Sequence, residues 1–381
     1  MGGLNLETYD GLMQGGSTGK AIVPGKSDES RLYLMITGKV SPAMPMNSTR
    51  LSETQIGAIR EWIEAGAKGP APGEAKVSVP ALPVIHPKAG LKPQIFDLAY
   101  STDGKLIALA TFKEVRLVDA ASRQPVASLT GHADAVRAVA FSRDGKLLAA
   151  AGGLPARSGE VKIWDVAGQK LLHTIKGHSD CIYAVAFSPD GRSIATSSYD
   201  KLIKLWDLDT EKEVRTFKDH IDAIYALAFT PDGKRLISGA ADRTIKIWNV
   251  DTAERLYTLS DAQDGINTVA LDPTGKYLAA GGLDKSLRVW ELGEKSGKLV
   301  NSLIAHEDAI LKVAWSPDGK RIITSSADRT VKVFNASDLR ELKTLPEPDW
   351  AYGLQWAPDG KTFAIGLLDG TWSTTPWGTQ I

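Results

Sequence analysis

The sequence predicts an all-β protein, a seven-bladed β-propeller, with a small α-helical segment at its N-terminus. The first observation is a turn dipeptide that recurs seven times at intervals of 41 to 46 residues, close to the length of a four-stranded blade. The second is a short apolar run before each turn and another after it. The third is a proline-rich stretch that separates the repeats from a helical pattern. The dipeptides are Asp103-Gly104, Asp144-Gly145, Asp190-Gly191, Asp232-Gly233, Thr274-Gly275, Asp318-Gly319 and Asp359-Gly360.

The chain divides into three predicted stretches. Residues 1–68 are expected to be helical, because Ser52 and Gln55 form a capping box ahead of an amphipathic run. Residues 69–93 hold six prolines, which favour an extended linker. Residues 94–381 contain the repeats and are predicted to form the propeller.

Composition excludes several classes of protein. The 381 residues carry 45 basic and 45 acidic side chains, and this balance argues against a broad surface that follows nucleic acid phosphates. With 43% hydrophobic residues the chain has ample material for a core, yet no apolar run reaches the length of a membrane-spanning helix. Cys181 is the single cysteine, so an internal disulfide is excluded. We expect a monomer with neither a nucleic acid partner nor a membrane span.

The last repeat lacks sequence for its outermost strand. Only residues 378–381 follow Trp377, whereas fourteen residues follow Trp206 before the next repeat begins. The segment 77–85, VSVPALPVI, is predicted to supply the missing strand, because prolines are tolerated on an outermost strand. The propeller would then be closed by strands from both ends of the chain.

The motifs KGH (176–178), SSYDKLIKLWD (197–207) and GAADRTIKIWN (239–249) resemble the WD-repeat β-propeller family. The resemblance covers about residues 88–381. It implies a buried hydrogen-bonded network in each blade, made by a histidine, a hydroxyl, an aspartate and a tryptophan. The matching residues are His178, Thr196, Asp200 and Trp206; His220, Ser238, Asp242 and Trp248; and, in part, His306, Thr324 and Asp328, with Phe334 in the place of the tryptophan.

These networks contain the side chains of a nucleophilic triad. Their recurrence favours a structural role, because one domain rarely holds three copies of an active site. The six histidines never fall at metal-ligand spacing within one element. We therefore expect no catalytic residues, no metal site and no enzyme activity.

One position in each repeat lies five residues after the place that His178 occupies in its own repeat, and it is predicted to begin the inner strand near the mouth of the channel. Four of the seven residues there are aromatic, against 7% of the whole chain, and one is arginine. Both residue types are enriched at binding hot spots. The alternative, that these side chains pack between blades, stays open. For the face with the His-containing loops we predict partner binding, with Tyr183 and Tyr225 as anchors and Arg137 selecting an acidic group. Across the seven repeats the position reads Phe96, Arg137, Tyr183, Tyr225, Asn267, Leu311 and Tyr352, and all except Leu311 are candidate contacts.

Residues 2–36, 43–46 and 51–67 are similar to the planctomycete-type cytochrome c domain. The resemblance implies haem attached through a C-x-x-C-H motif, with a methionine near the MP segment on the distal side. The sequence has no such motif, so Met44 or Met46 is expected to be vestigial, or part of a packing loop. Two explanations stay open: the reading frame starts at an internal methionine, or the module has lost its haem. No cofactor is expected unless an upstream segment supplies the motif.

The preferred function is a non-enzymatic protein-interaction scaffold that binds a protein or peptide. The alternative is electron transfer, in which the propeller belongs to a longer c-type cytochrome and docks a redox partner. For both, the resemblance to an exported cytochrome implies the periplasm or cell envelope, although the sequence shows no signal peptide.

Overall fold

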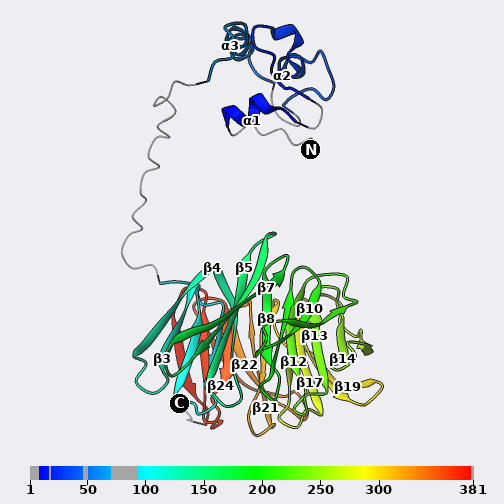
Figure 1. Ribbon diagram of the computed structural model, residues 1–381. Helices are drawn as coiled ribbons and strands as arrows, with labels where there is room; N and C mark the ends of the chain where they lie inside the picture. The colour runs from blue at the N-terminus through cyan, green and yellow to red at the C-terminus, as the bar shows by residue number, and fades with distance from the viewer. Residues whose placement is uncertain (1–7, 17–18, 46–49, 70–91, 379–381) are drawn as a thin grey trace. The chain divides into compact units, whose positions relative to one another are not determined.

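The computed structural model describes residues 8–16, 19–45, 50–69 and 92–378 of the chain, which divides into two compact units, 1–87 and 88–381. Strands make up 51% of the structure and helices 8%, so the prediction of a mostly β protein is confirmed. Figure 1 shows the helices in the first unit and the strands in the second. The predicted domain boundaries stay predictions, since most of the proline-rich stretch lies outside the described residues.

The first unit packs short helices around a small apolar core. Ile22 and Ile63 are fully buried in this core. The predicted capping box is confirmed: the Gln55 backbone N–H donates to Ser52 Oγ at 3.3 Å, and the Ser52 N–H donates to Gln55 Oε1 at 2.9 Å. Among the described residues, no helix is long and apolar enough to cross a membrane. The helices are α1 (Tyr9–Gln14), η1 (Ser27–Glu29), α2 (Arg31–Ile36) and α3 (Glu53–Glu64).

The second unit consists of antiparallel sheets in which strands pair in chain order. The first sheet has seven strands, β1 (Asp97–Tyr100), β2 (Leu106–Ala110), β3 (Phe112–Asp119), β4 (Pro125–Phe141), β5 (Leu147–Leu154), β6 (Ser158–Asp165) and β7 (Lys170–His178). The four-stranded sheets are β8 (Ile182–Phe187), β9 (Ser193–Ser198), β10 (Leu202–Asp207), β11 (Glu213–Lys218); β12 (Ile224–Phe229), β13 (Arg235–Ala240), β14 (Ile245–Asn249), β15 (Arg255–Leu259); β16 (Ile266–Leu271), β17 (Tyr277–Gly282), β18 (Ser286–Leu292), β19 (Gly297–Ile304); and β20 (Ile310–Trp315), β21 (Arg321–Ser326), β22 (Thr330–Asn335), β23 (Glu341–Pro346). The last sheet has three strands, β24 (Ala351–Trp356), β25 (Thr362–Leu367) and β26 (Trp372–Pro376).

Seven inner strands close into a ring. These are β1, β4, β8, β12, β16, β20 and β24; each contacts the next, and β24 contacts β1. Neighbouring sheets bury apolar side chains against each other, as where the rings of Phe217 on β11 and Trp248 on β14 meet edge to face at 5.7 Å. The unit is thus β-propeller-like (Figure 1). Its core lies between neighbouring sheets.

The seven-stranded sheet differs from the expected pattern of separate four-stranded units. Its strand β4 is 17 residues long. The first part of β4 pairs with β3, from Pro125 to Ala135, and the second part pairs with β5, from Val136 to Phe141. The chain stays extended where the other repeats have a loop. The outer strand of one group and the inner strand of the next are therefore continuous.

The recurring Asp-Gly turns connect each inner strand to the next strand. In the turn after β8, Ser188 Oγ donates to Asp190 Oδ1, which also accepts the Arg192 N–H at 3.1 Å. Gly191 follows in the left-handed region with a φ of 73°, where a side chain would be strained. This local chemistry explains why the dipeptide marks the repeat so clearly in the sequence.

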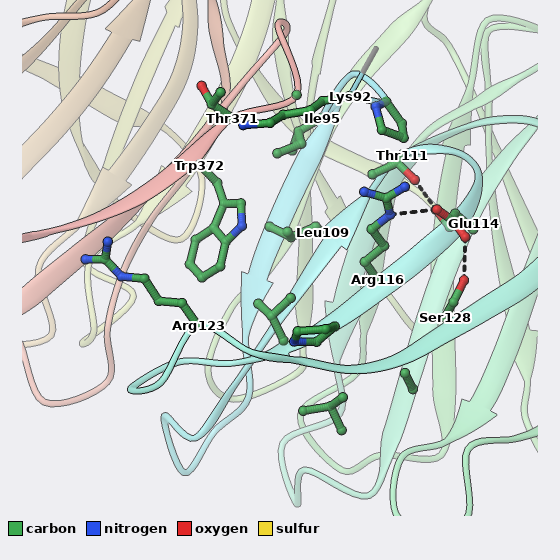
Figure 2. Close-up of a pocket in the computed structure, with 16 residues that line it drawn as sticks. Lys92, Ile95, Leu109, Thr111, Glu114, Arg116, Arg123, Ser128, Thr371 and Trp372 are labelled. Atoms are coloured by element: carbon green, nitrogen blue, oxygen red, sulfur yellow. Dashed lines mark hydrogen bonds and ion pairs between the residues drawn. The ribbon is translucent and has the colours of Figure 1, made fainter. Parts of the chain in front are cut away.

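The three-stranded sheet ends at β26, next to the first group of strands. A cavity of about 710 Å³ lies there, lined by Trp372 and by residues of β3 and β4 (Figure 2). Its polar groups pair with each other, since the Glu114 carboxylate accepts hydrogen bonds from Arg116 Nε at 2.6 Å and from Ser128. The predicted closing strand, 77–85, lies outside the described residues.

Candidate functional site

The structure brings His178, Thr196, Asp200 and Trp206 together in a buried network. His178 Nδ1 lies 2.8 Å from Asp200 Oδ2, and Nε2 lies 2.8 Å from Thr196 Oγ1. The Trp206 indole N–H donates to the same hydroxyl at 2.9 Å. The Asp200 carboxylate can only accept, so Nδ1 carries the proton directed to it. The Thr196 hydroxyl can accept two hydrogen bonds, and it also donates to the Lys204 carbonyl at 3.4 Å. One hydroxyl thus links the histidine to the tryptophan.

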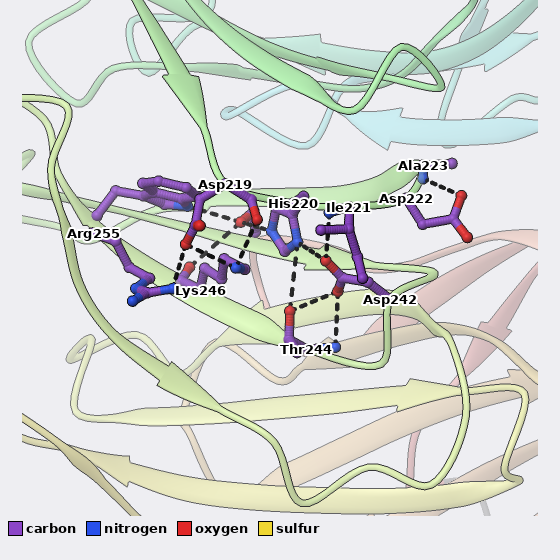
Figure 3. A network of polar contacts seen from close by, with 11 residues as sticks. Asp219, His220, Ile221, Asp222, Ala223, Asp242, Thr244, Lys246 and Arg255 are labelled. Carbon is purple, nitrogen blue, oxygen red and sulfur yellow. Dashed lines mark hydrogen bonds and ion pairs between the residues drawn. The ribbon is translucent and has the colours of Figure 1, made fainter.

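A second network has the same geometry in the next sheet (Figure 3). His220 lies 2.7 Å from Asp242 Oδ2 and 2.7 Å from Ser238 Oγ, and Trp248 donates to Ser238 at 2.8 Å. Burial alone would raise the pKa of Asp242, but hydrogen bonds from His220 and Thr244 hold that pKa well below its usual range. The carboxylate is therefore ionised and tied to the loop around it.

A third network is incomplete. His306 contacts Asp328 Oδ2 at 2.9 Å and Thr324 Oγ1 at 2.7 Å. Phe334 occupies the tryptophan position and is fully buried, so no indole needs an acceptor. Burial lowers the pKa of His306, which keeps the imidazole neutral.

The sheet of β16–β19 has lost both the histidine and the hydroxyl. Alanines occupy the two positions, Ala262 and Ala280. The Trp290 N–H instead donates to Asp261 Oδ2 at 2.7 Å. The buried indole thus finds an acceptor even where the network is absent.

The network in the β4–β7 group is broken at one residue. Ala150 occupies the position of Thr196, because Ala150 pairs with Lys162 as Thr196 pairs with Lys204. The group therefore lacks the hydroxyl that bridges histidine and tryptophan elsewhere. Trp164 Nε1 and both ring nitrogens of His132 are buried without hydrogen-bond partners among the described residues. Glu160 supplies the carboxylate, 3.4 Å from His132 Nδ1, and accepts the Ala133 N–H at 3.0 Å. Sequence reasoning missed Glu160 because it lies on the third strand rather than in the turn.

The Glu160 carboxylate makes stability depend on pH. His132, the Ala133 N–H and Lys162 together lower its pKa from 4.5 to about 2, against the effect of burial. A lowered pKa in the folded state stabilises the protein above pH 4.5, and this contribution is lost as the pH falls toward 2. We expect Glu160→Gln to lower the free energy of unfolding by about 2 kcal/mol at pH 7. Urea titrations should show the difference from wild type shrinking below pH 4.5, and a constant difference would contradict the assignment.

The seven predicted mouth residues line one cavity of about 720 Å³ at the centre of the ring. Tyr183 and Tyr225 meet edge to face at 5.1 Å, and the guanidinium carbon of Arg137 lies 4.9 Å from the Tyr183 ring centroid. The structure thus places together residues that are far apart in the sequence. These side chains both pack on one another and face the cavity, so their binding role stays a prediction. The lining positions are Phe96, Arg137, Tyr183, Tyr225, Asn267, Leu311 and Tyr352.

The cavity opens at the end of the ring that carries the loops of His178, His220 and His306, which we call the His-loop face. The turns between the second and third strands of the sheets lie at this end too. The Tyr199 N–H, in one such turn, donates to the carbonyl of Cys181, just before inner strand β8, and the Leu283 N–H donates to that of Gly265, just before inner strand β16. Large apolar side chains are exposed here, and Ile221 is 77% exposed. Sequence reasoning does not single them out, although Tyr199 and Leu283 occupy equivalent positions, one residue before Asp200 and Asp284. They are Phe112, Tyr199, Ile221, Leu283 and Trp350.

A charged pair crosses the cavity. Lys312 Nζ on β20 lies 2.7 Å from Asp97 Oδ1 on β1, although 215 positions separate them. The second oxygen of Asp97 accepts the Val139 N–H of β4 at 3.1 Å. Three inner strands are thereby tied together. Sequence reasoning missed this pair, because nothing local indicates its partner.

The first unit does not provide ligands for haem c. Covalent attachment needs two thiolates and a proximal histidine, yet the sequence holds no cysteine before Cys181 and no histidine before His86. Met44 packs against the apolar core of the unit, and Met46 lies outside the described residues. In the described part of the chain no group of three His, Cys, Asp or Glu residues could hold a metal ion.

Comparisons with known families match both units. The family model described as "WD domain, G-beta repeat" matches residues 123–165, 169–207, 211–249, 253–291 and 297–335, together more than half of the chain. The model described as "Planctomycete cytochrome C" matches residues 1–46. Both resemblances found in the sequence are therefore confirmed at the level of the family.

Curated relatives share short stretches with this chain. A ribosome biogenesis protein BOP1 homolog of Aedes aegypti is 34% identical over 65 residues, 17% of this chain and 8% of that protein. A periodic tryptophan protein 2 homolog of Schizosaccharomyces pombe is 30% identical over 89 residues, 23% of this chain and 10% of that protein. An uncharacterized WD repeat-containing protein of Synechocystis is 32% identical over 76 residues, 19% of this chain and 22% of that protein. The matches thus span only a small part of each relative.

Proposed function

Because the chain belongs to the WD40 repeat family, we propose that its second unit is a seven-bladed β-propeller that works as a non-enzymatic scaffold. It binds a protein or peptide segment on the His-loop face. Seven inner strands in a closed ring support the count of seven blades. The match to WD40 repeats favours a protein as the partner, since such repeats are typical of interaction scaffolds.

The observation that carries the binding proposal is the aromatic cavity at the centre of this face. Tyr183, Tyr225 and Tyr352 line it and are half-buried, so each offers a rigid apolar surface with a polar tip. Tyrosine and arginine are the residue types that dominate binding energy at interfaces. A cavity of about 720 Å³ has room for side chains of an inserted segment.

The buried networks support a structural rather than catalytic role for the histidines. The side chains of His178, His220 and His306 are completely buried, and none of them lines the central cavity. Each histidine and its aspartate instead fix a loop, as where Asp200 accepts the Ser179 N–H at 3.0 Å. Rigid loops preorganise a binding face, because less entropy is lost when the partner binds.

The match of the first unit to a cytochrome family favours a second candidate, in which the His-loop face docks a redox partner for electron transfer. The two candidates differ in the spectrum of a version extended upstream. This chain lacks the attachment motif and should show no Soret band under either candidate. A Soret band from covalently bound haem in the extended version would favour the redox function, and none there would favour the scaffold.

Replacing both anchors, Tyr183→Ala with Tyr225→Ala, should weaken peptide binding at least tenfold, because hot-spot side chains contribute about 2 kcal/mol or more. The probe is a peptide recovered from a displayed random library on the wild-type chain, with its Kd measured by fluorescence anisotropy. Tyr277→Ala is the matched control, since Tyr277 starts β17 at the opposite end of the ring. Unchanged affinity in a folded double variant would overturn the proposal.

A further inference from the structure

Arg137 is a cation of the central cavity without a counterion among the described residues. It forms no ion pair there, and its Nε is buried without a hydrogen-bond partner. Lys312, another basic side chain of the lining, is paired with Asp97. Leaving a guanidinium N–H without an acceptor costs free energy, so such groups are normally satisfied.

Aromatic rings fix the position of this guanidinium. Its central carbon lies 4.9 Å from the centroid of Tyr183 and 6.0 Å from that of Phe96. These cation–π contacts hold the flat group from two neighbouring strands. They do not satisfy the Nε–H group. The planar fork of a guanidinium matches the two oxygens of a carboxylate.

Phenol groups add further donors around Arg137. Burial raises the pKa of Tyr183 and of Tyr352, and the nearby Arg137 charge only partly offsets this effect. Both hydroxyls therefore keep their protons and can donate. Neither is hydrogen-bonded to another described residue, whereas the Asn267 amide already donates to the Ile310 carbonyl at 2.9 Å.

The carboxylates of the cavity and its rim are engaged elsewhere. Asp97 binds Lys312, Asp308 Oδ1 accepts the Ala309 N–H at 2.7 Å, and Asp180 Oδ1 accepts the Cys181 N–H at 2.7 Å. None forms an ion pair with Arg137. Among the described residues Arg137 therefore has no carboxylate in direct contact.

We propose that Arg137 binds the side-chain carboxylate of a glutamate or aspartate in the segment that enters the central cavity. This inference rests on the proposed function and adds the chemistry of the partner. One guanidinium matches the single charge of one carboxylate, whereas a phosphate carries nearly two negative charges. A C-terminal carboxylate is usually held by backbone N–H groups. The donors that the structure positions here belong to side chains, the Arg137 guanidinium with the phenols of Tyr183 and Tyr352, so the proposal takes an internal acidic side chain as the occupant.

The test selects displayed random peptides in parallel on the wild-type chain and on Arg137→Gln. Wild-type peptides should be enriched in an acidic residue at one position, and the variant's peptides should not. In a recovered peptide, changing that residue from glutamate to glutamine should weaken binding about 10- to 100-fold, the loss expected for a charge-assisted hydrogen bond. Arg137→Lys should bind with intermediate affinity, because an ammonium lacks the fork. Arg143→Gln, on the exposed turn after β4, is the matched control.

The outcomes separate this inference from the proposed function. Equal acidic enrichment on wild type and Arg137→Gln, or equal binding of the glutamine peptide, overturns the role of Arg137. Binding that is lost on amidation of the C-terminus but not on glutamine substitution overturns the choice of an internal side chain. If the Tyr183 and Tyr225 double variant still loses affinity in these cases, the proposed function stands and only the carboxylate assignment fails.

Discussion

Asp242→Ala is expected to lower the free energy of unfolding by about 3–4 kcal/mol, the largest effect among the single substitutions considered. The carboxylate accepts hydrogen bonds from His220 Nδ1 at 2.7 Å, from the Ile221 N–H at 3.1 Å and from the Thr244 hydroxyl at 2.6 Å. Alanine leaves the buried His220 Nδ1 and the part-buried Thr244 hydroxyl without this acceptor, and it frees the loop between two sheets. Equilibrium urea unfolding measures the difference.

Asp369→Ala provides a matched control for this prediction. Asp369 occupies the corresponding turn of the last sheet and accepts the Thr371 N–H at 2.8 Å and its hydroxyl at 2.6 Å, but it is exposed and has no histidine partner. Its loss should cost about 1 kcal/mol. Equal losses for the two variants would show that the histidine bond contributes nothing to stability.

Thr196→Ala is expected to cost about 2–4 kcal/mol, because it removes the hydroxyl that joins His178 to Trp206. The variant would reproduce in one group the broken network that the β4–β7 group has by nature. The converse change, Ala150→Thr, restores a hydroxyl between His132 Nε2 and Trp164 Nε1. It should raise stability by about 1–2 kcal/mol.

The reciprocal pair shares one measurement, the urea midpoint at a constant m-value. Thr196→Ser keeps the hydroxyl and should lose much less than Thr196→Ala, which distinguishes the hydrogen bonds from packing. If Ala150→Thr destabilises the chain as much as Thr196→Ala does, the two groups are not equivalent and the account of the broken network is wrong.

The repeats could be read from the sequence because their signals are local. An Asp-Gly turn has its own chemistry, and a buried tryptophan lies near the end of four of the third strands, β6, β10, β14 and β18. The period and the strand order therefore follow from short motifs. The capping box at Ser52 is likewise local, and it lies at the start of α3. The seven-stranded sheet could not be predicted in this way, because the continuity of β4 depends on pairing with two partner strands, β3 and β5.

Part of the candidate site followed from the same periodicity. Once the inner strands share a register, equivalent residues such as Tyr183 and Tyr225 must converge on one cavity, and the structure places them there. The Asp97–Lys312 pair and the carboxylate of Glu160 could not be predicted in this way. The first spans the ring between residues 215 apart, and the second replaces a lost turn aspartate from a different strand.

The most direct test of the central claim compares stability and binding in the same two proteins, Thr196→Ala and the double variant of Tyr183 and Tyr225. For each, the urea midpoint and the Kd for one library-selected peptide are measured at a temperature where both proteins are folded. If the buried networks serve architecture and the central cavity serves binding, Thr196→Ala has a lowered midpoint with a wild-type Kd, and the tyrosine variant has a Kd raised at least tenfold. The reverse pattern would contradict the account: lost binding in Thr196→Ala at full stability, together with unchanged binding in the tyrosine variant.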